Sequence, residues 1–337
     1  MNYLFKTIQP TPQAWAAMAA SPDCSVFFTP QWAEYLHRMG ERLIMVEVRG
    51  NTTTVGYFVG THRWVGIRIV TAPSIGTGTY AQGLCMLQPV SADERLAIYQ
   101  QLADWLFKSR QASYIQICDW ALHNSTDRLD AFGLYYNHRH TYAIDLRPDE
   151  SELWASLHYK SCKYCINKAR KEGLTVREVT DKDQIAAFAE YHSSHLADMM
   201  RRKSSRGLPC QRHKNILALC QSLFPDNVLM LDVITPDGLS IASSLFAYTN
   251  GVASYYTAAS LTQYLPLCPN ELIVWEAMQR LHNKGVTELI LGGVAHYKKK
   301  YSPFMADVPV LVFSRHRALL GIRKRAKTLY QQLFYKK

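Results

Sequence analysis

The side chains of this sequence best suited to chemistry lie in a basic, aromatic loop from Tyr297 to Tyr301. The loop follows a short apolar segment, 289–291, which predicts a β-strand and ends in Gly292-Gly293. Tyrosine hydroxyls and lysine ammonium groups donate hydrogen bonds to carbonyl and phosphate oxygens, so this loop is a candidate site. The loop by itself would more simply be interpreted as a solvated run of charge.

Two upstream elements would position this loop. A strand over 252–259 loses side-chain bulk towards its end, which lets a backbone or a ligand approach closely. The next helix is predicted to begin near Asn270, a good N-cap, with Glu271 in its first turn. A small-residue strand end, a helix N-terminus and a polar loop together predict a ligand cleft.

Composition limits the class of protein. The chain has 337 residues, of which 48% are hydrophobic, enough for two domains of ordinary size. The formal net charge of +11 favours anionic partners, such as phosphorylated donors, nucleotide sugars, tRNA or an anionic membrane face. We find no apolar run that could span a bilayer and no N-terminal secretory signal. The eight cysteines are scattered through apolar patterns, which suits a reducing cytoplasm.

The pattern of predicted elements occurs twice. The first half is predicted to contain a strand at 3–8, helices at 12–20 and 30–39, strands at 43–48, 54–59 and 67–70, a helix to 108 and a strand at 114–118. The second half is predicted to contain a strand at 174–179, helices at 181–202 and 213–224, strands at 228–234, 240–248 and 252–259, the helix from Asn270 and the strand from Leu289. A last strand is predicted at 310–313. The order predicts a mixed α/β protein with domains at 1–149 and 174–316, joined by residues 150–173.

The joining segment, 151–172, has apolar residues at helical spacing and many lysines. A packed linker with a solvated basic face and a ligand-facing helix are equally compatible with this pattern. Its Cys162-x-x-Cys165 pair has no second such pair and no histidine pair at zinc spacing, so we expect no metal site. No phosphate-binding glycine motif with its lysine and no G-x-S-x-G elbow occurs, so a covalent serine mechanism has no support.

Several segments resemble the Fem-like and cellulose-biosynthesis-like acyltransferases of the GNAT superfamily. The family's helix, strand and loop pattern appears here as Leu272-Ile273-Val274-Trp275, Gly285, Leu291-Gly292-Gly293 and Tyr297-Lys298. The joining segment is similar to the family signature W-x-x-L-x-x-K-x-x-R, with Lys163 where Arg is usual, and Phe27 to Trp32 looks like its F-x-S/T-P-x-W opening. Ile290 stands where the family usually has Asp, which weakens any role for an acid on this strand.

The resemblance implies two tandem GNAT-like domains, each a mixed and mostly antiparallel sheet flanked by helices. It implies transfer of an acyl group to an amine of a cell-envelope or polysaccharide-type precursor, in which the enzyme positions both reactants and stabilises the oxyanion. The catalytic residues would be Lys298, Tyr297 and Tyr256. The donor would contact Ala258, Ala259, Ser260, Asn270 and Glu271. The acceptor, bound between the halves, would contact Lys160, Lys163, Trp32 and Tyr80.

Three alternatives remain for the donor and the activity. Acyl-CoA is the expected co-substrate, because the sequence shows no coiled-coil arm of the kind often found in the Fem-like enzymes that use aminoacyl-tRNA. No permanently bound cofactor is expected. Aminoacyl-tRNA would exploit the positive charge. Pro266 and Pro269, which lack N–H groups for a pyrophosphate, and Ile290 favour a non-catalytic binding protein on the same scaffold. The basic tail, 317–337, predicts an amphipathic helix that packs on the second domain or contacts the inner face of an anionic membrane.

Overall fold

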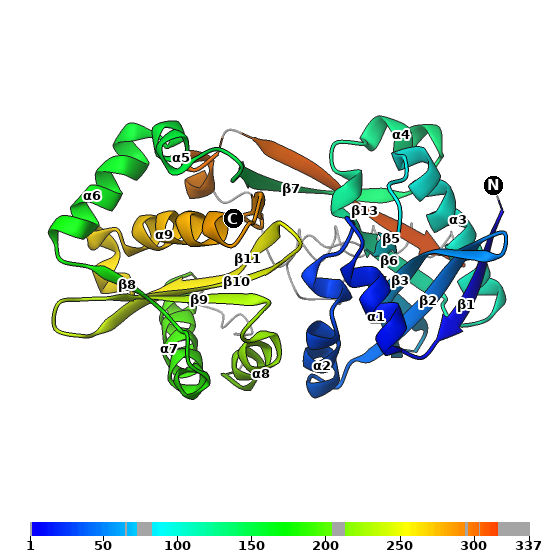
Figure 1. The fold of residues 1–337 in the computed structure, drawn as a ribbon, viewed down its shortest axis with the longest axis horizontal. Coiled ribbons are helices and arrows are strands. Elements are labelled where there is room, and N and C mark those ends of the chain that lie inside the picture. Colours follow the sequence, from blue (N-terminus) through cyan, green and yellow to red (C-terminus); the bar gives the residue numbers. More distant parts are fainter. Residues whose placement is uncertain are drawn as a thin grey trace, which may run out of the picture.

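The computed structural model of the chain describes residues 2–64, 66–72, 83–203, 213–293, 296–302 and 304–315. Figure 1 shows two lobes side by side, the first half of the chain forming one and most of the second half the other. Tyr80 and the predicted tail helix at 317–337 lie outside the described residues. Among the described residues, no helix combines the length and the apolar character needed to cross a bilayer.

The element order of the first half agrees with the prediction. Its elements are β1 (Tyr3–Ile8), α1 (Pro12–Ala19), α2 (Pro30–Arg38), β2 (Arg42–Gly50), β3 (Thr53–Trp64), β4 (Arg68–Ala72), β5 (Leu84–Met86), α3 (Ala92–Lys108) and β6 (Tyr114–Cys118). Local chemistry sets the helix ends. For example, the Thr29 hydroxyl accepts a hydrogen bond from the Trp32 amide, and Pro30 occupies the first turn of α2.

The second half repeats this order. Its elements are β8 (Thr175–Glu178), α7 (Ile185–Lys203), α8 (His213–Leu223), β9 (Val228–Ile234), β10 (Ser240–Thr249), β11 (Val252–Ser260), α9 (Pro269–Asn283) and β12 (Glu288–Ile290). In each half a late strand pairs in parallel with an earlier one, β6 with β4 and β12 with β11. A parallel pair joined through a helix inside an otherwise antiparallel sheet agrees with the mixed, mostly antiparallel sheet that the resemblance implied.

One sheet runs through both halves, in the order β1-β2-β3-β4-β6-β13-β7-β12-β11-β10-β9-β8. The join consists of β7 (Tyr136–Asp145) and β13 (Met305–Ser314), which cross between the lobes in Figure 1. β7 pairs with β13 along most of its length and with β12 over its last three residues. β13, which the sequence placed in the second domain, also pairs with β6 of the first half.

Helices cover the sheet of the second half on both sides. α9 packs on one face in a hydrophobic cluster with the joining segment, and α7 and α8 pack on the other. α2 of the first half also packs in the α7–α8 cluster, so the two halves share a core there.

The joining segment is a broken helix rather than a continuous one. It consists of α5 (Glu150–Ser156), a π-helical turn η3 (Tyr159–Lys163) and α6 (Tyr164–Lys171). Leu157 and His158 have extended backbone angles, which interrupt the helix between α5 and η3. The break lets Leu157 and Cys162 both reach the core, while the lysines remain on the outer side.

Candidate acyl-transfer site

The parallel pairing of β11 with β12 is short. It joins Val252–Ser254 to Glu288–Ile290, whereas β11 continues to Ser260. Beyond Ser254, β11 is paired in the described part of the chain with β10 alone. We call residues 255–260 on this side the open edge of β11. A strand edge with unpaired backbone groups can hydrogen-bond an extended ligand.

A β-bulge decides which side chains lie at this edge. Tyr255 pairs with Phe246 and Thr257 with Leu245, so Tyr256 is an extra residue on β11. As neighbours on a strand, Tyr255 and Tyr256 point to opposite faces, and the extra residue places Thr257, which is hydrogen-bonded to His192 of α7, on the same face as Tyr256. Tyr255 stacks on Phe246 with ring centroids 4.7 Å apart and packs against the α9 side, whereas Tyr256 packs with the α7–α8 cluster.

Lys298 lies directly beside Tyr255. The side chain is 9% exposed, and its ammonium donates hydrogen bonds to the Leu291 carbonyl at 2.6 Å and to the Gly292 carbonyl. The nitrogen lies 5.7 Å from the centre of the Tyr255 ring and 5.8 Å from that of Tyr297. The two aromatic faces stabilise the buried cation.

A glycine makes this arrangement possible. Gly292 has φ +67°, and a Cβ at this position would lie 3.4 Å from the Tyr255 carbonyl oxygen. A left-handed residue at the end of β12 turns the chain so that its carbonyl meets Lys298. The structure therefore brings Lys298 and Tyr297 together, as the sequence predicted, but with Tyr255 as the partner from β11.

Tyr256 occupies a different environment. Its hydroxyl is hydrogen-bonded to Tyr35, and its ring lies 6.1 Å from the ring of Trp32. Burial raises the pKa of Tyr256 well above its usual value. The structure thus places this predicted catalytic tyrosine between the two halves, on the far face of the sheet from Lys298. The resemblance named the tyrosine of this pair that faces the α7–α8 cluster, whereas its neighbour Tyr255 faces Lys298.

An ion pair occupies the N-terminal end of α9. Glu271, in the first turn, pairs with Lys300, and the Lys300 nitrogen lies 5.3 Å from the centre of the Tyr301 ring. Cys268 holds the N-cap position with φ +61° and makes no side-chain capping bond, and Pro269 follows it. The predicted N-cap, Asn270, lies within the helix instead and donates a hydrogen bond to Ser260 at 3.3 Å. A carboxylate therefore already lies where the helix dipole would attract an anion.

The small residues of β11 divide between the two faces. Ala259 is buried in the α7–α8 cluster, and Ser260, also buried, faces α9 through its bond to Asn270. Ala258 is half-buried and pairs with Ser244 on β10. Ala258 and Ser260 remain candidates for contact with a donor at the open edge, whereas Ala259 is a packing residue.

The predicted acceptor residues are not gathered in one place. Trp32 is only 2% exposed and packs edge-on against Phe27, so the structure assigns it to the core shared by the halves. Lys160 is exposed on η3, and Lys163 donates a hydrogen bond to the Ala155 carbonyl at 2.9 Å. Tyr80 lies outside the described residues.

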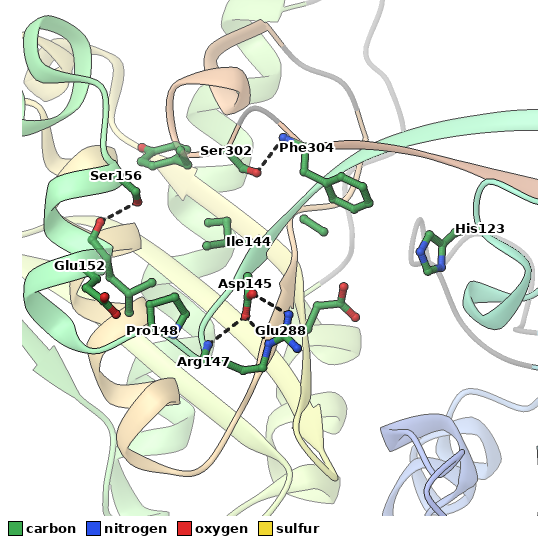
Figure 2. A pocket seen from close by; sticks show the side chains of 13 residues that line it. His123, Ile144, Asp145, Arg147, Pro148, Glu152, Ser156, Glu288, Ser302 and Phe304 are labelled. Carbon is green, nitrogen blue, oxygen red and sulfur yellow. Dashed lines mark hydrogen bonds and ion pairs between the residues drawn. The ribbon is translucent and has the colours of Figure 1, made fainter. Parts of the chain in front are cut away.

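A pocket of about 640 Å³ lies where the halves meet. Its lining comes from α5, from β7 and the residues after it, from Glu288 of β12, from the chain between η6 (His296–Lys300) and β13, and from His123 of the first half. Figure 2 shows Glu152 and Ser156 on one side and His123 on the other, with Asp145 and Arg147 paired between them. Tyr301 lines this pocket, and its ring also lies against the ammonium of Lys300, which is paired with Glu271.

Glu288 contributes a half-buried carboxylate to the pocket. Its carboxylate accepts a hydrogen bond from the Trp120 indole at 2.8 Å, and burial raises its pKa above the usual value. His123, which stacks on Trp120 with centroids 4.7 Å apart, lies beside it. Sequence analysis missed both residues because 165 positions separate them in the chain. Ile290, at the position where an acid was expected, is buried among apolar residues.

Comparisons with known proteins agree with the fold. Residues 156–299 match the family model described as an acetyltransferase (GNAT) domain. The structure is similar to that of FemX, with a TM-score of 0.69, 13% identity, and coverage of 94% of this chain and 99% of that one. It is also similar to L-PGS from Bacillus licheniformis, with a TM-score of 0.55, 12% identity, and coverage of 96% and 97%.

A tandem GNAT protein from the clavulanic acid biosynthesis pathway is similar too, with a TM-score of 0.52, 10% identity, and coverage of 93% and 98%. No curated protein matches the sequence. At these identities the structural matches show the fold alone. Together with the family match, they confirm the predicted fold class and the GNAT resemblance.

Proposed function

Because residues 156–299 match the model of the GNAT acetyltransferase domain, we propose that this protein transfers an acyl group from an activated ester or thioester to an amine. The amine nitrogen would attack the carbonyl carbon, and the bond to the leaving oxygen or sulfur would break as the tetrahedral intermediate collapses. The observation that carries the proposal is the buried Lys298 ammonium beside the open edge of β11.

Lys298 would stabilise the oxyanion. Its ammonium is held by two carbonyls and two aromatic rings, so it is positioned before the donor arrives. A donor that pairs with the open edge would place its carbonyl next to β11, on the side where Tyr255 and Lys298 lie. A preorganised cation in a site with little water contributes more to the transition state than one in bulk solvent.

The pocket at the junction of the halves would hold the acceptor. Its lining includes three carboxylates, Asp145, Glu152 and Glu288, which suit an amine-bearing compound. We assign Glu288 as the proton acceptor, because burial raises its pKa and makes it a stronger base than an ordinary carboxylate. By its family resemblance, the acceptor would be a precursor of the cell envelope or of a polysaccharide.

The N-terminal end of α9 helps to decide which acyl donor the protein could bind. Acyl-CoA, the donor expected from the sequence, would bring its pyrophosphate towards this helix N-terminus. Here Glu271 already occupies the first turn in its ion pair with Lys300, and Pro269 has no N–H to donate. These features favour a donor whose phosphates bind elsewhere, such as an aminoacyl-tRNA. Exposed Lys160 and Tyr159 on η3 provide a basic, aromatic surface for such a donor.

Thermal unfolding with separate additions of acetyl-CoA, CoA and tRNA tests the proposal. A ligand that binds only the native state raises the melting temperature. We expect tRNA to raise the melting temperature, by an amount that falls steeply as salt is added. The increase should be the same in wild type and Lys299→Ala and smaller in Lys298→Ala. Lys299, an exposed neighbour, is the matched control.

Two other outcomes would change the proposed donor or the proposed activity. A shift with acetyl-CoA that Lys298→Ala removes would keep acyl transfer and restore acyl-CoA as the donor. The absence of a shift with any of the three ligands would instead favour a non-catalytic protein on this scaffold.

A further inference from the structure

A cluster of two thiols and one carboxylate lies where α6 meets the beginning of α9. Cys165 belongs to α6, Cys268 is the residue before α9, and Glu271 lies in the first turn of α9. One ligand atom of each residue lies within 4.8 Å of the corresponding atoms of the other two. All three residues are half-buried. The sequence predicted no metal site, and it did not reveal this cluster because 103 positions separate Cys165 from Cys268.

We propose that this cluster is a binding site for a zinc ion. Tetrahedral zinc binds sulfur at about 2.3 Å and carboxylate oxygen at about 2.0–2.2 Å, which places its ligands roughly 3.5–3.8 Å from one another. Side-chain shifts of about 1 Å would bring the three groups to that spacing. A water molecule would complete the coordination, since only three protein ligands are available in the cluster.

The ligand set selects the class of metal. Two thiolates favour a soft or borderline ion and disfavour magnesium and calcium, which prefer oxygen ligands. Two thiolates and one carboxylate carry three negative charges, against two positive charges on the metal. Lys168, near Cys268, would offset the one remaining negative charge. Each thiol would lose its proton to solvent on binding.

Zinc binding would rearrange the ion pair at the beginning of α9. The Glu271 carboxylate would turn from Lys300 to the metal, and the Lys300 ammonium would become available on the side of Tyr297 and Tyr301. The metal would also join α6 to α9 directly. This consequence for the acyl-transfer site rests on the proposed function, whereas the binding itself does not.

Titration of the fully reduced protein with Co²⁺ tests the site without any assay of activity. We expect one tetrahedral Co²⁺ per chain with a thiolate-to-metal charge-transfer band, displaced by one equivalent of Zn²⁺. The double variant Cys165→Ser/Cys268→Ser should lose the band. Glu271→Gln should weaken binding at least about tenfold, the smallest loss typical even of an outer-shell partner.

Two control variants carry matched changes outside the cluster. Cys220→Ala removes a buried thiol on α8, and Glu276→Gln alters a carboxylate five residues further along α9. Both should bind Co²⁺ as wild type does, and circular dichroism should show that all variants are folded. Octahedral Co²⁺ without the charge-transfer band, or a band that survives in the double cysteine variant, would overturn the proposal.

Discussion

The buried histidine His192 should make the stability of the second half depend on pH. It lies on α7 with no exposed surface, and its ring nitrogens are hydrogen-bonded to Ser243 at 2.9 Å and Thr257 at 3.0 Å. Burial, together with neighbouring His195, lowers its pKa from 6.5 to about 3. Between these values the unfolded chain takes up a proton that the folded chain excludes.

The sign and size of the effect follow from linkage. Because the folded pKa is depressed, the neutral imidazole contributes full stability above pH 6.5, and this stability is lost as the pH falls towards 3. The free energy of unfolding should fall by about 1.4 kcal/mol per pH unit below 6.5, which is about 2 kcal/mol between pH 7 and pH 5. Burial also lowers the pKa of His195, which adds to the slope with the same sign.

Denaturant unfolding followed by circular dichroism at pH 7, 6 and 5 measures the slope. His192→Gln should be less stable at pH 7 but should show a smaller loss of stability on acidification. His37→Gln, a substitution of an exposed histidine on α2, should keep the wild-type slope. Equal slopes for wild type and His192→Gln would refute the assignment of this acid sensitivity to the buried imidazole.

Three further substitutions test the site and the core. Glu288→Gln should lower kcat by about 10²–10⁴-fold and should remove the acidic limb of the pH–rate profile. In wild type this limb should lie above the usual carboxyl pKa, because burial raises the pKa of Glu288. An unchanged profile would exclude Glu288 as the base. Trp32→Ala should cost about 3–5 kcal/mol in denaturant unfolding, whereas Trp64→Ala, at a side chain that is 69% exposed, should cost far less; equal costs would contradict the shared core. Asp119→Ala removes a carboxylate 2.7 Å from the buried Arg95 guanidinium and should also cost about 3–5 kcal/mol; a stability close to wild type would show that the remaining partners of Arg95 suffice.

Local chemistry in the sequence determined the elements and their order. Thr29 followed by Pro30 marks the start of α2, and the repeated succession of strands and helices indicates the GNAT order in both halves. The proximity of Lys298 to Gly292 was also predictable, because only a few residues separate them. Such features depend on backbone preferences and capping bonds within a few positions, which a single sequence carries.

Only the tertiary structure decided which distant groups meet. One extra residue in β11 puts Tyr256 and Thr257 on the same face and so shifts the alternation of the residues that follow, and a bulge leaves no periodic signal. Pairing of β13 with β6, and the pocket that joins His123 to Glu288, depend on contacts between segments far apart in the chain. Periodicity predicts that a side chain faces a core or a partner strand but does not identify its neighbour, because that choice is made by packing over the whole chain.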